Sequence, residues 1–267
     1  MPGKAAAAAR ASGLTLEELG EGLGTASTVL RGNAGSAGLD TPVPTCPSWT
    51  VLDLVAHQGM VHRWATSHVR GAPETDPLRF EAEGRAAADV LGWFDEGATA
   101  LLQALFDAPD DLVARTFLRD APAPRVFWTR RQCFETTVHA VDAMAARLGR
   151  APLPDETWLR PRLATDGIDE LLTGFVPRDK QGVQPERATR LLVRPDDAAL
   201  AWLLDLAPDR PASTTRLTGA DAVATDADVV WAGGAVELFL RLWSRTGAEP
   251  ADALEGWWRE TVSVTWG

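Results

Sequence analysis

The chain has 267 residues, of which 26 are basic and 37 are acidic, giving a formal net charge of −11 at pH 7. This length is sufficient for two domains of typical size. The acidic balance disfavours a protein that mainly neutralises nucleic-acid phosphates or docks on anionic lipid, so we expect neither nucleic acid nor a membrane as a partner. The apolar stretches are far shorter than the roughly 20 residues that a membrane-spanning helix needs.

Counts of single residue types narrow the chemistry further. Two cysteines, Cys46 and Cys133, permit at most one disulfide, so we expect free thiols and a cytoplasmic location. Two lysines stand against 24 arginines, and tyrosine is absent, which disfavours a lysine Schiff base or a tyrosine acid. Anions would therefore be bound by arginine. The chain has four histidines, at positions His57, His62, His68 and His139.

The N-terminal part of the chain is expected to be helical. Residues 1–12 combine one lysine with a run of alanines, and we interpret them as a disordered tail rather than a signal peptide. Apolar residues at helical spacing predict a first helix over residues 14–30, which Gly32 and Asn33 would end.

Three more helices are expected before residue 152. Thr50 and Asp53 have the spacing of a capping box and predict a helix over residues 51–69. Apolar periodicity then predicts a helix over residues 80–106 and another over residues 127–148. Four helices joined in this way are typical of a four-helix bundle.

The pattern changes after Pro152. We expect a helix over residues 157–175 and an apolar helix that follows Gly233 and Gly234 and ends before Gly247. Short strands are predicted over residues 188–194, 199–206 and 228–231, and the segment around residues 257–266 reads partly as a strand. The expected organisation is α+β with two domains: the bundle over residues 13–152 and a smaller mixed α/β domain over residues 153–267.

Glu135 and His139 are the most informative pair. Four residues apart on a helix, they lie on one face with Cβ atoms roughly 6 Å apart, close enough to share a metal ion. His57 is on the second helix, which can face the fourth in a bundle, and two histidines with one carboxylate suit a catalytic zinc site. A hydrogen-bonded pair on the helix surface would explain the same spacing. Asp53 and His57 share this spacing, but Asp53 is already explained as a cap.

The remaining histidines and the cysteines receive simpler interpretations. His62 lies about 140° around the helix from His57, which predicts a flanking or pocket residue. His68, near the end of its helix, is favoured there by the helix dipole. Cys46 and Cys133 are interpreted as packed thiols rather than nucleophiles.

Two signatures in this sequence resemble a known family. Residues 43–64, which run from Val-Pro-Thr-Cys-Pro-Ser-Trp through His57 to Trp64, resemble the N-terminal signature of the mycothiol-dependent maleylpyruvate isomerase family. Glu135-Thr-Thr-Val-His139 with Asp142 resembles the second signature. Residues 233–245 are similar to the family's C-terminal helix ending in Leu-Trp-Gly-Arg, with Ser244 in place of the glycine. The resemblance implies a DinB-like metal-binding four-helix bundle and a C-terminal sterol-carrier-like α/β domain.

The resemblance also implies roles for particular residues. The metal ligands would be His57, Glu135 and His139, with Zn²⁺ as the expected divalent metal and mycothiol as cosubstrate. Arg245 corresponds to the terminal arginine of the family's helix and is a candidate catalytic residue that reaches across the domain interface. The alternative for Arg245 is a positive charge that satisfies carbonyl groups at the end of the helix.

Three functions follow from this resemblance. The favoured one is a metal-dependent enzyme that activates mycothiol as a metal-bound thiolate for attack on a small electrophile, in thiol S-transfer or thiol exchange. The first alternative is a cis–trans isomerase of the maleylpyruvate type, and the second is a non-catalytic metal-binding module. We expect a monomer or a weak homodimer.

Overall fold

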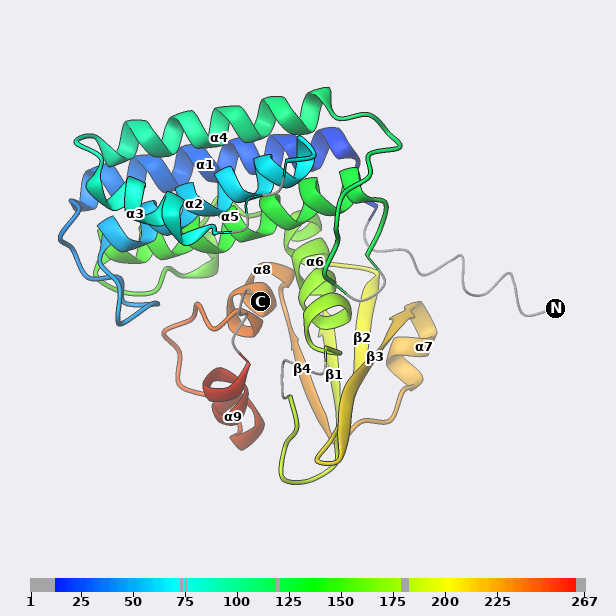
Figure 1. Ribbon diagram of the computed structural model, residues 1–267. Coiled ribbons are helices and arrows are strands. Elements are labelled where there is room, and N and C mark those ends of the chain that lie inside the picture. The colour runs from blue at the N-terminus through cyan, green and yellow to red at the C-terminus, as the bar shows by residue number, and fades with distance from the viewer. Residues whose placement is uncertain (1–12, 73, 75, 119–120, 179–182, 263–267) are drawn as a thin grey trace.

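The computed structural model describes residues 13–72, 74, 76–118, 121–178 and 183–262. The fold is α+β, with a helical N-terminal region followed by a region built on a four-stranded sheet (Figure 1). Within these residues, no helix is both long enough and apolar enough to cross a membrane. The expected disordered tail, residues 1–12, lies outside the described residues.

The first helix, α1 (Leu16–Ala37), is longer than expected. Thr15 caps it together with Glu18, and the helix continues through Asn33, so the prediction that it stops at Gly32 and Asn33 is wrong. The Asn33 side chain donates to the carbonyl of Val29 at 2.7 Å, and its Oδ1 accepts from Arg147 at 2.5 Å. Both polar ends of the Asn33 side chain are therefore bonded, one to α1 itself and one to Arg147, so Asn33 is accommodated inside the helix that it was expected to end.

The second helix confirms its predicted bounds. α2 spans Val51–Val69 and begins with the expected capping box. The backbone N–H of Thr50 donates to Asp53 at 2.7 Å, while the N–H of Asp53 donates to the Thr50 hydroxyl at 3.4 Å. The capping box starts α2 at a position that places His57 in its second turn.

The predicted third helix is two helices, α3 (Leu78–Ala86) and α4 (Val90–Asp107). The break occurs because Asp89 caps α4 by accepting the backbone N–H of Gly92 at 2.9 Å. The indole of Trp93 lies against Gly59 and Gly84, where a Cβ atom would come within 2.1 Å and 2.6 Å of the ring. Two glycines on α2 and α3 therefore make the space into which Trp93 packs.

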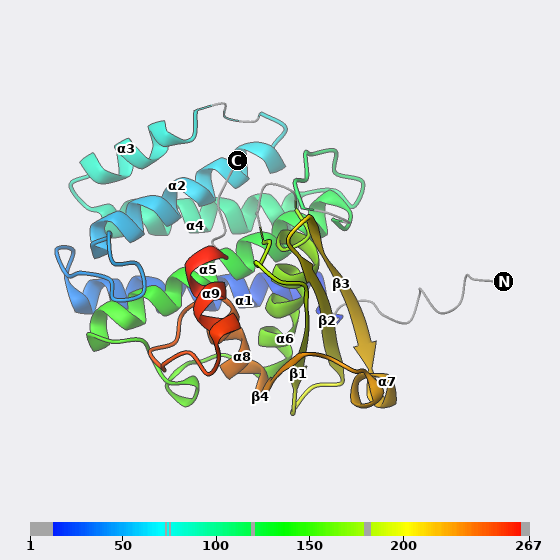
Figure 2. The ribbon, with the colours of Figure 1, turned by 90° about the horizontal axis from the view of Figure 1, so that it is seen from below.

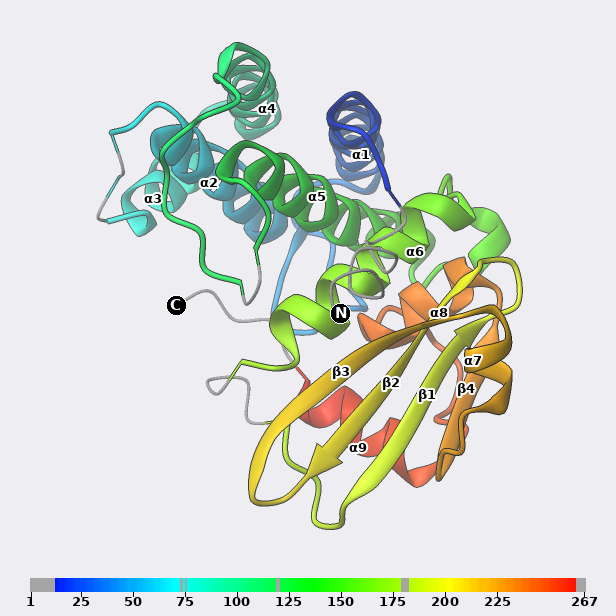
Figure 3. The same cartoon turned by 90° about the vertical axis from the view of Figure 1, so that its right-hand side faces the viewer.

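α5 (Pro124–Leu148) begins with a proline in its first turn and ends at Gly149, whose φ of 69° is left-handed. It starts slightly earlier than the expected residue 127. In the helical region α1, α2, α4 and α5 lie side by side, with α5 nearest the C-terminal region (Figures 1 and 3). Most residues of α5 are buried, so it can present side chains to both regions.

The C-terminal region begins with a short 3₁₀ turn, η1 (Pro154–Glu156), and then α6 (Pro161–Asp169). α6 passes directly into a π-helical segment, η2 (Glu170–Phe175), so the helix predicted over residues 157–175 begins only at Pro161 and consists of two consecutive pieces. π-helical turns are rare and occur frequently at functional sites.

Four strands form one sheet in the order β3-β2-β1-β4. β1 (Thr189–Pro195), β2 (Leu200–Ala207) and β4 (Val229–Gly233) confirm the three predicted strands. β1 pairs antiparallel with β2 and parallel with β4. β3 (Arg210–Thr218) and the short α7 (Gly219–Ala224) were not predicted, because β3 is an edge strand in which only Ala212 is buried.

Two helices complete the chain, α8 (Ala235–Leu242) and α9 (Ala253–Thr261). The expectation of a strand around residues 257–266 is wrong for the part that the structure describes, because that part belongs to α9. Asp252 caps α9 by accepting the backbone N–H of Glu255 at 2.8 Å. Trp258 is fully buried and donates its indole N–H to the carbonyl of Leu242 at 2.9 Å.

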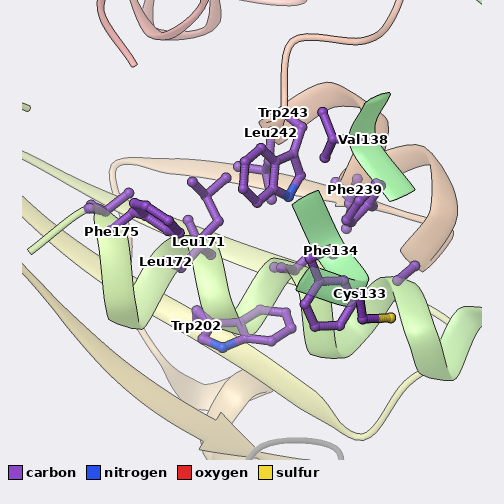
Figure 4. Close-up of a cluster of buried hydrophobic side chains, with 14 of the residues drawn as sticks. Cys133, Phe134, Val138, Leu171, Leu172, Phe175, Trp202, Phe239, Leu242 and Trp243 are labelled. Carbon is purple, nitrogen blue, oxygen red and sulfur yellow. The ribbon is translucent and has the colours of Figure 1, made fainter. Parts of the chain in front are cut away.

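One hydrophobic cluster extends through both regions (Figure 4). Phe134 on α5 and Phe239 on α8 both pack against Gly167 of α6, where a Cβ atom would come within 2.9 Å and 2.5 Å of their rings. Trp202 of β2 lies in the same cluster. The predicted boundary at residue 152 falls between α5 and η1, and the division into two domains stays a prediction since the two regions share this core.

Candidate metal centre

His57, Glu135 and His139 lie together, each offering one ligand atom within 4.8 Å of the others. The Oε1 atom of Glu135 is 3.7 Å from Nε2 of His57 and 3.4 Å from Nε2 of His139. Glu135 and His139 are one turn apart on α5, and His57 faces them from α2. The three residues that the sequence singled out as ligands are therefore brought together.

The donor set fits a divalent metal ion. Oε1 of Glu135 is buried and has no hydrogen-bond partner among the described residues, although two imidazole nitrogens face it. A buried carboxylate oxygen without a partner destabilises the folded protein, so such an atom usually binds a ligand or an ion. Two imidazole nitrogens and one carboxylate oxygen are ligands that zinc takes in catalytic sites.

The other oxygen of Glu135 is held by the protein. Arg131, which is fully buried, donates from Nη2 to Oε2 of Glu135 at 2.7 Å and also pairs with Glu170 of η2. Burial opposes ionisation of Glu135, but His139, His57 and Arg131 outweigh it and hold its pKa well below the ordinary value. Glu135 is therefore an anion whose Oε1 points at the two histidines.

His139 is oriented by Asp142. The Nδ1 atom of His139 lies 2.9 Å from Oδ2 of Asp142, a fully buried carboxylate that also accepts a hydrogen bond from Thr45 at 2.6 Å. Burial lowers the pKa of His139, but Asp142 and Glu135 outweigh it and raise that pKa to about 9. The contact with Asp142 leaves Nε2 of His139 facing Glu135.

Arg245 reaches from the C-terminal region to this carboxylate. Its Nε and Nη2 atoms each lie 2.9 Å from an oxygen of Asp142, and Nη1 donates to the carbonyl of Trp243 at 2.7 Å. As expected, Arg245 reaches from the C-terminal region to the helical region, and the residue that it contacts there is Asp142. No role was predicted for Asp142, although its spacing of three residues from His139 is a signal that could have identified it.

A cavity of about 600 Å³ opens at these ligands, and α2, α5, α8 and α9 all contribute to its lining. Figure 2 shows α9 lying over α5 in the view from below. The indole of Trp49 stacks on His139 with ring centroids 5.6 Å apart and lies 4.8 Å from His57. Both polar and apolar side chains line the cavity: Thr45, Cys46, Trp49, His57, Glu135, Val138, His139, Leu171, Leu242, Trp243, Ser244, Arg245, Arg259 and Val262. Its size suits a small molecule.

The two remaining histidines lie elsewhere. His62 is fully buried, bonds through Nε2 to Thr136 at 2.9 Å, and is not among the described residues that line the cavity. Burial lowers its pKa to about 3, so His62 is a neutral core residue. His68 packs between Trp64 and Trp128, with ring centroids 4.8 Å and 5.0 Å away. Burial and Arg115 lower the pKa of His68.

Both cysteines are free and protonated. Cys133 is fully buried under Gly22, and burial raises its pKa. Cys46 lines the cavity, with its sulfur 3.5 Å from Asp142 and 3.5 Å from Nη2 of Arg245. Burial and Asp142 raise the pKa of Cys46 to about 12, so it stays a neutral thiol.

Together, these features define an α+β protein with a candidate His₂Glu metal centre at the base of a cavity that both regions line. Residues 21–144 match the family model described as the mycothiol maleylpyruvate isomerase N-terminal domain. This match confirms the family resemblance over these residues. Neither the search of curated proteins nor the search of solved structures finds a match.

Proposed function

We propose that this protein is a divalent-metal-dependent enzyme that activates mycothiol for attack on a small electrophile, by thiol S-transfer or thiol exchange. The observation that carries the proposal is the buried Oε1 atom of Glu135, which faces His57 and His139 without a hydrogen-bond partner in the described structure. The match of residues 21–144 to a mycothiol-related family supports the choice of thiol. When bound, Zn²⁺ lowers the pKa of a coordinated thiol, so that the thiolate is present at neutral pH.

Different residues of the chain would bind the metal ion, orient its ligands and leave the cosubstrate thiol without a competitor. His57, Glu135 and His139 would hold the ion, and three protein ligands leave room for the incoming sulfur. Asp142 orients His139 through the 2.9 Å contact to Nδ1. Cys46 keeps its proton because its pKa is raised to about 12, so the protein's own thiol would not compete with the cosubstrate.

The second candidate function is cis–trans isomerisation of the maleylpyruvate type, and the family description of residues 21–144 favours it. Addition of the thiolate to a conjugated cis double bond, rotation and elimination would give the trans isomer and return the thiol. A carbon that bears a leaving group would instead give a stable S-conjugate. Both reactions use the same three ligands, so the electrophile that the cavity accepts decides between them.

The test combines metal analysis with turnover on the full chain. We expect the zinc-loaded protein to consume mycothiol with a haloacetamide, to isomerise maleylpyruvate, or both, and His57→Ala to lose zinc and activity. Glu135→Gln should behave like His57→Ala, whereas Glu83→Gln on the exposed face of α3 should match the wild type. Zinc binding without turnover would indicate a non-catalytic metal-binding module, and absence of zinc binding would refute the proposal.

The remaining expectations stay part of this proposal. The two free cysteines support a cytoplasmic location. The proposed partners are mycothiol and a small electrophile, and the proposed assembly is a monomer or a weak homodimer.

A further inference from the structure

Ser244 has an unusual backbone conformation. Its φ of 58° is the one positive value of a non-glycine residue in the part of the chain that the structure describes. The N–H of Ser244 donates to the carbonyl of Arg241 at 3.1 Å, and the N–H of Arg245 donates to that of Leu240 at 2.7 Å. This is the Schellman arrangement that ends α8, with Ser244 in the position that glycine usually takes. A residue with a Cβ atom adopts this conformation at a cost that glycine avoids.

The Ser244 hydroxyl is also unsatisfied. Its Oγ atom is buried and has no hydrogen-bond partner within the described ranges, and the residue lines the cavity that holds the candidate metal ligands. A buried hydroxyl without a partner is destabilising. Serine therefore carries two costs at this position, one from its backbone and one from its hydroxyl.

The turn that ends α8 explains the backbone conformation of Ser244 but not its hydroxyl. It directs the chain from α8 so that Arg245 reaches Asp142, and glycine would make the same turn with less strain. The hydroxyl therefore needs a separate explanation. Strain and unsatisfied groups persist in proteins where they serve binding or catalysis.

A second side chain indicates which ligand the hydroxyl meets. Arg259 of α9 lines the same cavity, and its Nε atom is buried without a hydrogen-bond partner in the structure as described. The Nη atoms of Arg259 are bonded to Glu255 and to the carbonyl of Ala248. Within the described residues, the part of the lining that α8, α9 and the residues just after them contribute carries no carboxylate. This wall consists of Leu242, Trp243, Ser244, Arg245, Arg259 and Val262, and we call it the C-terminal wall.

We propose that Ser244 is a specificity-determining residue, whose hydroxyl donates a hydrogen bond to a carboxylate of the small molecule that occupies the cavity. Arg259 complements the charge of that carboxylate. The Ser244 hydroxyl and the Nε–H of Arg259 are two donors without a partner among the described residues, so they favour an anionic oxygen, which accepts, over a further donor. The inference rests on the proposed function, since it assigns a chemical class to the electrophile.

The experiment compares Ser244→Gly with Ser244→Ala in the full chain. The probes are maleate and maleamide, which share a cis double bond and differ in charge, and calorimetry measures their binding to metal-free and zinc-loaded protein. We expect the wild type to prefer maleate, and both variants to bind it about tenfold more weakly. Glycine should also raise the midpoint of thermal unfolding by about 2–4 °C through relief of the backbone strain, whereas alanine keeps the strain. Ser36→Ala, on the exposed face of α1, is the matched control.

Two results would overturn the inference. One is equal binding of maleate and maleamide by the wild type, including no binding of either, and the other is unchanged maleate affinity in both Ser244 variants. A lower unfolding midpoint for Ser244→Gly would refute the strain argument on which it depends. Failure of the proposed function is separate, because it appears as absence of zinc binding or of mycothiol turnover in the wild type.

Discussion

Arg245 and Asp142 form a two-point ion pair that joins the C-terminal region to the candidate metal centre. Nε and Nη2 of Arg245 each lie 2.9 Å from a carboxylate oxygen, and the same carboxylate is 2.9 Å from Nδ1 of His139. Asp142 is fully buried, so the pair is shielded from solvent. Groups that orient a metal-binding histidine through its second nitrogen tune both its geometry and its basicity. The C-terminal region therefore contributes to the orientation of His139 without supplying a ligand.

Replacement of Arg245 by methionine should weaken metal binding. The variant keeps much of the side-chain volume but releases Asp142, so His139 loses part of its fixed orientation, and we expect zinc affinity to fall about 10- to 100-fold. Competition with a chromophoric chelator measures this. Arg210→Met, which breaks an exposed ion pair with Asp205 on the sheet, is the control and should keep the wild-type affinity. Equal affinities for the two variants would argue against the orienting role.

Zinc should stabilise the folded protein. A ligand that binds only the native state at 100 times its Kd adds about 2.7 kcal/mol to the free energy of unfolding. For a chain of this size, that corresponds to a rise of about 5–10 °C in the unfolding midpoint. Differential scanning calorimetry with zinc and with excess chelator tests this, and Glu135→Gln should show no difference between the two conditions. An identical midpoint for the wild type in both conditions would contradict the metal centre.

Gly167→Ala should destabilise the contact between the helical region and α8. The new Cβ atom would lie 2.5 Å from the ring of Phe239 and 2.9 Å from that of Phe134, so two buried aromatic side chains must move. We expect a loss of about 1–3 kcal/mol in the free energy of unfolding, measured by chemical denaturation. Gly20→Ala in α1, where nothing lies within 4 Å of the new atom, should instead be neutral or stabilising by up to about 1 kcal/mol. A stabilised Gly167→Ala variant would show that the packing is looser than described.

Asp169 should contribute to stability in a pH-dependent way. Its carboxylate accepts hydrogen bonds from Trp202 at 3.0 Å, Arg130 at 3.0 Å and Nη2 of Arg216 at 2.8 Å. Burial opposes ionisation, but Arg216 and Arg130 outweigh it and lower the pKa of Asp169. The stabilisation is therefore fully present above the unfolded-state pKa, near pH 4, and is lost as the pH falls through the folded-state pKa.

The variant Asp169→Asn tests whether the stabilisation by Asp169 is lost on acidification, as expected. At neutral pH the variant should lose about 2–4 kcal/mol, because the arginines keep their charge without a carboxylate partner. The difference between wild type and variant should shrink when urea denaturation is repeated from about pH 5.5 down to about pH 3.5. Asp205→Asn, in an exposed ion pair with Arg210, should show little difference at either pH. A difference that grows on acidification would mean that the pKa of Asp169 is shifted upward.

Local signals in the sequence explain the parts of the fold that could be predicted. The capping box of Thr50 and Asp53 acts within four residues, so it set the start of α2 correctly. The break between α3 and α4 was missed because it depends on tertiary packing as well as on the Asp89 cap. Trp93 fills the space between Gly59 and Gly84, which are far apart in sequence. A run of apolar residues does not reveal such a contact.

The same distinction holds at the site. Glu135 and His139 could be identified from their spacing on one helix and His57 from its place on a helix that can face theirs, and the family resemblance implied all three as ligands. The pair of Asp142 and Arg245 joins residues 103 positions apart, and it forms only in the folded chain, where the segment after α8 reaches α5. The segment that forms the second half of α9 was expected to be partly a strand. The buried contact of Trp258 with Leu242 favours the helix instead.

The shared hydrophobic cluster determines how small molecules can reach the candidate metal centre. Phe134 of the helical region and Phe239 of the C-terminal region both pack against Gly167, and both are fully buried. A hinge motion that swung the regions apart would expose this cluster to water at about 25 cal/mol for each Å² of apolar surface. Small molecules should therefore enter and leave the cavity while the two regions remain packed. The movements that admit them should be small shifts of lining segments, namely the loop with Cys46 and Trp49 and the helix α9.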